Sequence, residues 1–165
     1  MATNTLRDLV VDSLEDMYNA EQQLTKVLPK LANKASNSTL KNAFEDHLKQ
    51  TRNHVKRLEN VFKELNMNPK ERKCEGIRGI VNEGEELLKE FEGSDIRDAA
   101  LIAAAQKTEH YEISSYGTLI NLSKRLGLKD SINYLKDNLN EEYASDDKLT
   151  KIAESIINGK VEFVN

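Results

Sequence analysis

The stretch TLKNAFEDHLKQTRNHVKRLENVFKEL, at residues 39–65, decides the fold of this chain. Its apolar residues recur every three or four positions, which is the spacing of a buried helix face. The residues on that face are Leu40, Phe44, His47, Thr51, His54, Leu58, Val61 and Leu65. Polar side chains occupy the middle of the face, so the sequence predicts a long helix that carries polar groups into a core.

Three other long segments repeat this pattern, at residues 5–34, 95–126 and 131–158. Each has an apolar stripe with a helical period, and each stripe contains acidic residues near its middle. The inward residues expected in the last segment are Ile132, Leu135, Leu139, Glu142, Asp146, Leu149, Ala153 and Ile156. A weaker helical pattern lies at residues 75–91, within a long connection, and predicts a short extra helix.

Residues that favour helix ends mark the boundaries of these segments. Ser38 is the expected N-cap of the helix at 39–65, and Ser94 or Asp95 is the expected N-cap of the next long helix. Gly127 is expected to end that helix, because glycine readily adopts a left-handed backbone conformation. These boundaries give four helices of similar length, about 40 Å each.

The lengths of the connections predict how the helices are arranged. Short turns make the first long helix antiparallel to the second, and the third antiparallel to the fourth. The connection of about 30 residues between the second and third can cross the bundle, which allows these two helices to run parallel. The predicted fold is an all-α, ferritin-like four-helix bundle in a single domain, residues 1–165, with a short extra helix in the long crossover.

Composition narrows the possible functions. The 165 residues are 32% charged and 5% aromatic, which suits long helices better than a β-sandwich. The formal net charge is −4 and no basic block stands out, so no nucleic-acid partner is expected. The sequence has no signal-peptide core and no apolar run of membrane length, and the single Cys74 excludes an internal disulfide. We expect a cytoplasmic protein with no membrane partner and with Cys74 at its surface.

Polar groups on all four long helices are predicted to meet at one level of the bundle. The candidate metal ligands chosen on this basis are Glu21, His54, Glu109, Glu112, Glu142 and Asp146. A buried carboxylate costs several kcal/mol unless it is compensated, and two cations would neutralise most of this charge. Carboxylate and imidazole ligands favour two iron or manganese ions as cofactors.

Other polar residues near this level have simpler explanations. His47 precedes His54 by seven residues, roughly 10 Å along the helix, so we expect it in the core or beside the ligands rather than on the same ion. His110 points about 100° away from Glu109 and is expected at the periphery. Tyr116 is expected to pack in the core, with a hydrogen bond near the site as the alternative.

Four strings carry a resemblance to a known family: AEQQLTKVLPKLA at 20–32, HLKQTRNHVKRLENVF at 47–62, KTEHYEISSYGTL at 107–119 and LNEEYASDDKLTKIA at 139–153. Over nearly its whole length the chain resembles the YciF-type ferritin-like proteins of bacteria. The resemblance implies a rubrerythrin-like four-helix bundle with a crossover helix, a dinuclear metal site and a homodimer. It also implies a part in bacterial stress responses, and it supplies no reaction.

The resemblance also identifies site residues. The positions that match the ferritin-like metal-site pattern are Glu21, His54, Glu109 and Glu142. Two positions depart from the pattern, because Thr51 stands where a glutamate is expected and Ser145 where a histidine is expected. Glu112 and Asp146 are the candidates that replace the missing ligands.

We therefore expect a dinuclear metal-binding stress protein that is redox-active towards peroxide or ferrous iron, an oxidoreductase of the peroxidase, catalase or ferroxidase kind. Two alternatives stay open. The first is metal storage or buffering, although only GKVEFVN follows the last predicted helix, which argues against a ferritin cage. The second is a metal-free helical scaffold, in which the central acidic residues are individually dispensable.

Overall fold

The computed structural model describes residues 5–160 apart from 71 and 95, and for residues 157–160 it describes the backbone alone. All secondary structure in this part of the chain is helical. The helices are α1 (Leu6–Lys34), α2 (Ser38–Glu64), α3 (Glu75–Glu90), α4 (Arg97–Leu126) and α5 (Lys129–Lys160). The predicted all-α fold is confirmed, including the short helix in the long connection.

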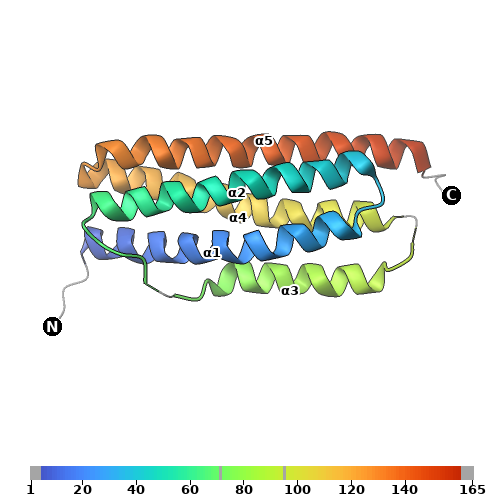
Figure 1. Ribbon diagram of the computed structural model, residues 1–165, viewed down its shortest axis with the longest axis horizontal. Helices are drawn as coiled ribbons and strands as arrows, with labels where there is room; N and C mark the ends of the chain where they lie inside the picture. Colours follow the sequence, from blue (N-terminus) through green and yellow to red (C-terminus); the bar gives the residue numbers. More distant parts are fainter. Residues whose placement is uncertain (1–4, 71, 95, 161–165) are drawn as a thin grey trace.

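The four long helices lie side by side, and α3 runs along one edge of the bundle (Figure 1). α1 is antiparallel to α2, and α4 is antiparallel to α5. After α2 the chain returns along α3 before α4 begins, so α2 and α4 run in the same direction. α3 packs on α1 and α4, while α2 packs on α1 and α5. This arrangement confirms the predicted ferritin-like bundle with a crossover helix.

The apolar core is divided into two clusters, one on each side of the polar middle of the bundle. One cluster takes residues from the first half of α1 and the second halves of α2 and α4, including Leu14, Phe62 and Tyr116. The other takes the opposite halves, including Leu28 and Phe44. Each such buried side chain contributes about 1.5–3 kcal/mol. The two clusters therefore fix the helices around a polar layer.

The buried face of α5 differs in part from the predicted stripe. Its buried residues are Ser131, Leu135, Asn138, Glu142, Leu149 and Ile152. Ile132, Leu139 and Asp146 are only partly buried. Ser131 and Asn138 occupy buried positions because hydrogen bonds satisfy them, to Glu64 and to Tyr116 respectively. An apolar period does not reveal such positions, so part of the predicted stripe was wrong by one residue.

Two helix starts also differ from the prediction. Asn37, rather than Ser38, is the N-cap of α2, and its side-chain oxygen accepts hydrogen bonds from two backbone N–H groups at 2.9 and 3.1 Å. α4 begins after Ile96, which makes no side-chain capping bond, so Ser94 is not the cap. Asp95, the other predicted cap, lies outside the described residues.

Two other helix ends contain residues that the sequence singled out. Gly127 ends α4 with a φ of 75°, as predicted. Cys74 is the N-cap of α3 and is fully buried, so the expected surface position was wrong. Its Sγ lies 3.1 Å from Asp16 Oδ2 and 3.2 Å from the Tyr111 hydroxyl. The thiol therefore helps to attach α3 to α1 and α4.

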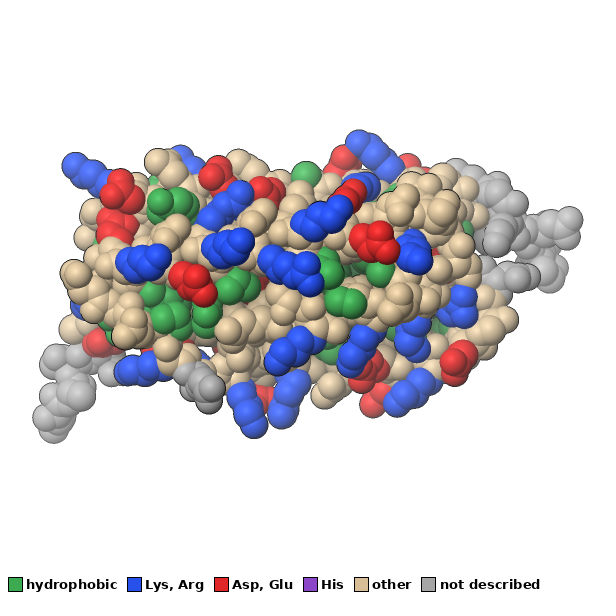
Figure 2. All heavy atoms as spheres, in the orientation of Figure 1, with side chains coloured by type: hydrophobic (Ala, Val, Ile, Leu, Met, Phe, Trp, Pro, Cys, Tyr) green, Lys and Arg blue, Asp and Glu red, His purple; other side chains and the backbone are tan. Residues whose placement is uncertain are grey.

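The outer surface is richer in basic groups than the net charge suggests. Figure 2 shows Lys and Arg side chains along the face that α2 forms with α1 and α5. The exposed bases of α2 are Lys41, Lys49, Arg52, Lys56 and Lys63. Some of the acidic residues that give the chain its negative net charge are instead buried in the bundle. Within the described residues, no helix combines the length and the apolar character needed to span a membrane.

Asp98 links the start of α4 to the turn between α1 and α2, and it is only 7% exposed. Its carboxylate accepts hydrogen bonds from the backbone N–H of Ser36 at 2.9 Å and of Asn37 at 2.7 Å. We expect Asp98→Ala to lower the free energy of unfolding by about 2–4 kcal/mol, because two donors lose a charged acceptor. Urea denaturation checks this, with Asp137→Ala on the exposed face of α5 as control. Equal losses in the two variants would contradict the assignment.

Candidate metal centre

A cluster of ionisable side chains fills the polar layer between the two apolar clusters. Its six members are Glu21 from α1, His47 and His54 from α2, Glu109 and Glu112 from α4, and Glu142 from α5. Five of them are at most 1% exposed, and His47 is 4% exposed. Four carboxylates and two imidazoles therefore share a site that is shielded from water.

The cluster contains two overlapping groups of possible metal ligands. Within each group one donor atom per residue lies within 4.8 Å of all the others: Glu21, His54 and Glu142 form one group, and His47, Glu109, Glu112 and Glu142 form the other. Ligand atoms at such separations can surround a single ion. Glu142 belongs to both groups.

His54 is held between this cluster and an outer ion pair. Its Nδ1 lies 3.2 Å from Glu21 Oε1 and 2.9 Å from Glu142 Oε1. Its Nε2 lies 2.8 Å from Glu141 Oε2. Arg57 donates to both oxygens of Glu141 at 2.9 Å. The ion pair therefore turns Nδ1 towards the cluster, as outer hydrogen-bond partners do for metal-binding histidines.

His47 presents its other ring nitrogen to the cluster. Its Nε2 lies 3.2 Å from Glu109 Oε1 and 3.6 Å from Glu142 Oε2. Its Nδ1 lies 3.3 Å from Gln50 Oε1, which can only accept a hydrogen bond. This contact keeps a proton on Nδ1 and leaves Nε2 as the potential ligand. Thr51 donates to the backbone carbonyl of His47 at 2.9 Å and is not a member of the cluster.

A chain of hydrogen bonds connects Glu21 to the edge of the bundle. The Tyr116 hydroxyl donates to Glu21 Oε1 and accepts from Asn138 Nδ2 at 3.0 Å. Arg57 donates to Asn138 Oδ1 at 3.0 Å. Tyr116 is fully buried, as expected, and it also bonds a candidate ligand. Burial and the charge of Glu21 raise the pKa of Tyr116 well above its usual value, so the hydroxyl stays a donor.

Both histidines of the cluster are stabilised in their charged form. Burial alone would lower the pKa of His54, but the nearby carboxylates, Glu21 foremost, outweigh burial and raise it to about 12. Burial of His47 is likewise outweighed, mainly by Glu109, and its pKa rises to about 10. Two imidazolium groups therefore balance part of the buried negative charge at neutral pH. A metal ion must displace their protons to bind.

The carboxyl groups of the cluster divide into neutral and charged members. Burial, reinforced by the charges of Glu142 and Glu21, raises the pKa of Glu112 well above its usual value. Burial also raises the pKa of Glu142 to about 8, although His47 opposes the shift. For Glu109, by contrast, the charge of His47 outweighs burial and lowers the pKa. At neutral pH Glu112 therefore holds a proton while Glu109 is ionised.

Several buried oxygens of the cluster receive no hydrogen bond from any described group. These are Glu21 Oε2, Glu109 Oε2, both carboxyl oxygens of Glu112, and Glu142 Oε2, whereas Glu142 Oε1 has its ion-pair contact with His54 Nδ1 at 2.9 Å. Buried polar atoms in folded proteins nearly always have a partner. A cation would satisfy these oxygens, so the donor set fits a metal ion of the kind that accepts carboxylate and imidazole ligands.

The structure brings together five of the six residues that the sequence proposed, and it corrects the position of Asp146. The Asp146 side chain is 22% exposed, accepts a hydrogen bond from Gln106 at 2.9 Å and lies 3.2 Å from His110. Four helical residues turn through about 400°, so Asp146 points about 40° away from Glu142 and towards the outside of α4. His110 is exposed, as predicted.

Two residues of the site were not among the sequence candidates. His47 lies in the cluster, and its ring centroid is 6.3 Å from that of His54, closer than the helix rise between the two backbones. The prediction had used the rise alone, although the two rings lean towards each other. Glu141 was not singled out in the sequence. A glutamate beside a candidate ligand, opposite Arg57 on the neighbouring helix, is the signal that could have identified it.

Comparisons with known proteins establish the family. The family model described as "Domain of unknown function (DUF892)" matches residues 5–162. The chain is also 44% identical to Protein YciF of Escherichia coli over 163 residues, which is 98% of both chains. This chain belongs to the DUF892 family. The resemblance to YciF-type proteins found in the sequence is thereby confirmed.

Solved structures agree with this assignment. The crystal structure of the E. coli stress protein YciF has 43% sequence identity and a TM-score of 0.91, covering 96% of this chain and 100% of that one. YcfI from Rhodopseudomonas palustris has 42% identity and a TM-score of 0.87, covering 90% and 95%. A two-domain Anabaena variabilis protein with a ferritin-like domain, at 14% identity and TM-score 0.66, covers 99% of this chain and 41% of its own length. The last likeness supports the ferritin-like fold alone.

The cluster of this DUF892 protein compensates for its two departures from the ferritin-like pattern. Where α2 has Thr51 in place of a glutamate, α4 supplies the extra carboxylate of Glu112. Where α5 has Ser145 in place of a histidine, α2 supplies the second imidazole, His47. The usual dinuclear set also contains four glutamates and two histidines. The types of potential donor are therefore those of the pattern, while their distribution over the helices differs.

The raised pKa values predict how the stability of the metal-free protein depends on pH. Glu112, His47 and His54 all hold their protons more tightly in the folded chain than in the unfolded chain. Between pH 6 and pH 9 the folded state therefore binds more protons, and its stability falls as pH rises. Each such group contributes about 1.4 kcal/mol per pH unit within its window.

Glu112→Gln removes one of these groups and keeps the shape of the neutral side chain. We expect the free energy of unfolding of this variant to fall less steeply with pH than that of the wild type, by up to about 1.4 kcal/mol per pH unit. Urea unfolding at pH 6, 7 and 8 in the presence of a chelator measures both slopes. Parallel pH dependences would show that Glu112 does not carry a raised pKa.

Proposed function

We propose that this protein binds two iron or manganese ions in the cluster and acts as a redox-active stress protein on peroxide or ferrous iron. The observation that carries the proposal is the membership of Glu142 in both donor groups. A carboxylate in that position can bridge two ions, as glutamates do in the dinuclear sites of ferritin-like bundles. The other five donors then divide into one set for each ion.

The types of donor support iron or manganese. Four carboxylates and two imidazoles make up the cluster, and both ligand types suit these metals. Zinc accepts the same ligands, but a carboxylate-rich pair of positions favours iron or manganese. The one thiol of the chain, Cys74, packs elsewhere, against Asp16 and Tyr111.

Two such ions, when bound, supply one electron each for the two-electron reduction of peroxide. The chain orients the ligands and shields the site. Glu112 holds a proton at neutral pH because burial and the neighbouring carboxylates raise its pKa, and this proton leaves when the carboxylate binds a cation. Tyr116 keeps its proton and orients Glu21 through a hydrogen bond. The near-complete burial of the donors excludes bulk water from the site.

The alternatives make different use of the same residues. Storage needs many ions per chain, whereas the cluster offers two overlapping donor groups. A metal-free scaffold needs none of the central acids, yet five buried carboxylate oxygens of the cluster have no hydrogen-bond partner among the described groups. Such oxygens cost stability unless a cation or proton compensates them.

We also place the protein in the cytoplasm as a homodimer. A single cysteine without a disulfide partner is compatible with a reducing compartment. The dimer is carried over from the resemblance to YciF-type proteins. Sedimentation velocity at micromolar concentration is expected to give the mass of two chains, and a single-chain mass would contradict the dimer.

Removing single donors is expected to lower metal content in a graded way. Glu142→Ala should lose most of both ions, because both groups share this carboxylate. His54→Ala and His47→Ala should each lose about one of the two ions. Elemental analysis of protein purified without chelators measures the ratio of metal to chain. Metal should also raise the melting temperature of the wild type and not that of Glu142→Ala.

Asp146→Ala is the matched control, because this acidic residue lies next to the cluster in sequence but not in space. It is expected to keep the metal content of the wild type. Unchanged stoichiometry in all three donor variants would contradict the proposed metal site. Metal content lost equally in Asp146→Ala would show that the donor set drawn from the geometry is wrong.

A further inference from the structure

A groove of about 390 Å³ opens between α2 and α5, beside the cluster. Its walls include Phe44, His47 and Gln50 from α2, and Ser145, Lys148 and Leu149 from α5. One of these residues, His47, is itself a member of the donor cluster. The groove therefore extends from the surface of the bundle to a candidate metal ligand.

The groove and the rest of the cluster are separated by single side chains. His47 Nε2 lies 3.2 Å from Glu109 Oε1. Ser145 of α5 lines the groove together with His47. His47 is 4% exposed, whereas the other five donors are at most 1% exposed. The place where the cluster comes nearest to solvent is thus the floor of this groove.

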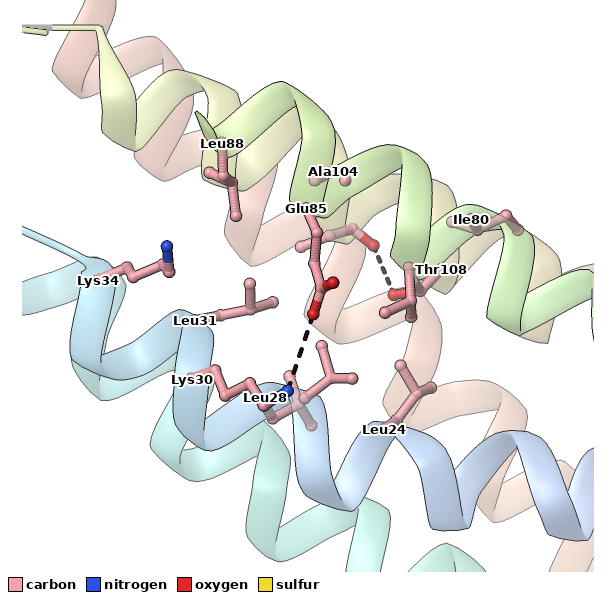
Figure 3. A pocket seen from close by; sticks show the side chains of 14 residues that line it. Leu24, Leu28, Lys30, Leu31, Lys34, Ile80, Glu85, Leu88, Ala104 and Thr108 are labelled. Atoms are coloured by element: carbon pink, nitrogen blue, oxygen red, sulfur yellow. Dashed lines mark hydrogen bonds and ion pairs between the residues drawn. The ribbon is translucent and has the colours of Figure 1, made fainter. Parts of the chain in front are cut away.

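Two other cavities do not contain a donor in their walls. Figure 3 shows the first, an apolar cavity of about 50 Å³ between α1, α3 and α4, beside which Lys30 pairs with Glu85 at 3.7 Å. The second, of about 330 Å³, lies between α1 and α4 and is lined by Asp16, Arg72 and Ser115. Neither of these leads to a member of the cluster.

The charges at the rim of the groove favour the entry of a neutral or anionic small molecule. Asp46 pairs with Lys49 at 3.0 Å and with Lys148 at 3.6 Å. Two lysines and one aspartate leave this rim with a net positive charge. A positive rim repels cations and attracts small anions, although exposed charges act weakly and are screened by salt.

We propose that the groove between α2 and α5 is the route by which peroxide, or an anion of its size, reaches metal ions held by the cluster. Ser145 keeps this route open, because its small side chain stands in the wall of the groove that His47 also lines. A bulky residue there would fill the groove above His47. The proposal rests on the proposed function, since it needs metal ions in the cluster.

Azide is a suitable probe, because it is an anion of peroxide size that binds metal ions and changes their absorption. The cobalt(II)-loaded protein is mixed with azide, and the rate of the change in visible absorption is measured. Ser145→Phe is expected to slow azide association about tenfold or more relative to the wild type. Ser145→Ala, which leaves the groove open, should bind azide at close to the wild-type rate.

Ser115→Phe is the matched control, because Ser115 is a partly buried helical serine that lines the cavity between α1 and α4. It should leave azide association unchanged. Ala144→Phe narrows the groove from an exposed wall residue that is not one of the donors, and it should also slow association if Ser145→Phe fails to hold cobalt. Cobalt content is measured for every variant.

The outcomes separate this proposal from the proposed function. Wild-type azide rates in both cobalt-loaded groove variants would overturn the route, and so would slowing in Ser115→Phe alone. Failure of azide to bind the cobalt-loaded wild type would also overturn it while leaving metal binding intact. Failure of the wild type to bind cobalt would defeat the proposed function and the route together.

Discussion

The structure depends on the compensation of buried charge in the middle of the bundle. Four carboxylates and two imidazoles occupy a layer between two apolar clusters, and the clusters provide the free energy that holds the helices at this spacing. Protons and imidazolium groups neutralise part of the layer, but five carboxylate oxygens keep no hydrogen-bond partner among the described groups. Cations bound in this layer would stabilise the folded state, and metal binding would then be coupled to folding stability.

The helix that carries a given ligand matters less than the level at which the ligand lies. Glu112 on α4 occupies the layer in which Thr51 of α2 offers no carboxylate, and His47 of α2 provides the imidazole that Ser145 of α5 does not. All four long helices pass through the same layer, so any of them can carry a donor of a given type that points into the site. The bundle, rather than a fixed sequence motif, thus sets the donor geometry.

The fold followed from the sequence because it depends on segment lengths and periods. The 30-residue connection allowed the parallel arrangement of α2 and α4 that the structure has, and central polar residues in otherwise apolar stripes marked the site. The predictions that were wrong depend on the direction of individual side chains. Asp146 was predicted in the cluster, but it points about 40° away from Glu142 around the helix axis. His47 was not predicted as a donor, because the estimate from helix rise did not include the length of its side chain. Burial of Asn138 depends on partners that no local pattern reveals.

The two donor groups are not equivalent, and the difference originates outside the cluster. His54 presents Nδ1 and is fixed by Glu141, which the charges of His54 and Arg57 keep ionised by lowering its pKa to about 2 against the effect of burial. His47 presents Nε2 and is oriented by the neutral Gln50, at the floor of an open groove. A charged partner strengthens a histidine ligand more than a neutral amide does. If the cluster binds two ions as proposed, the ion beside His54 would therefore be held more tightly than the ion beside His47.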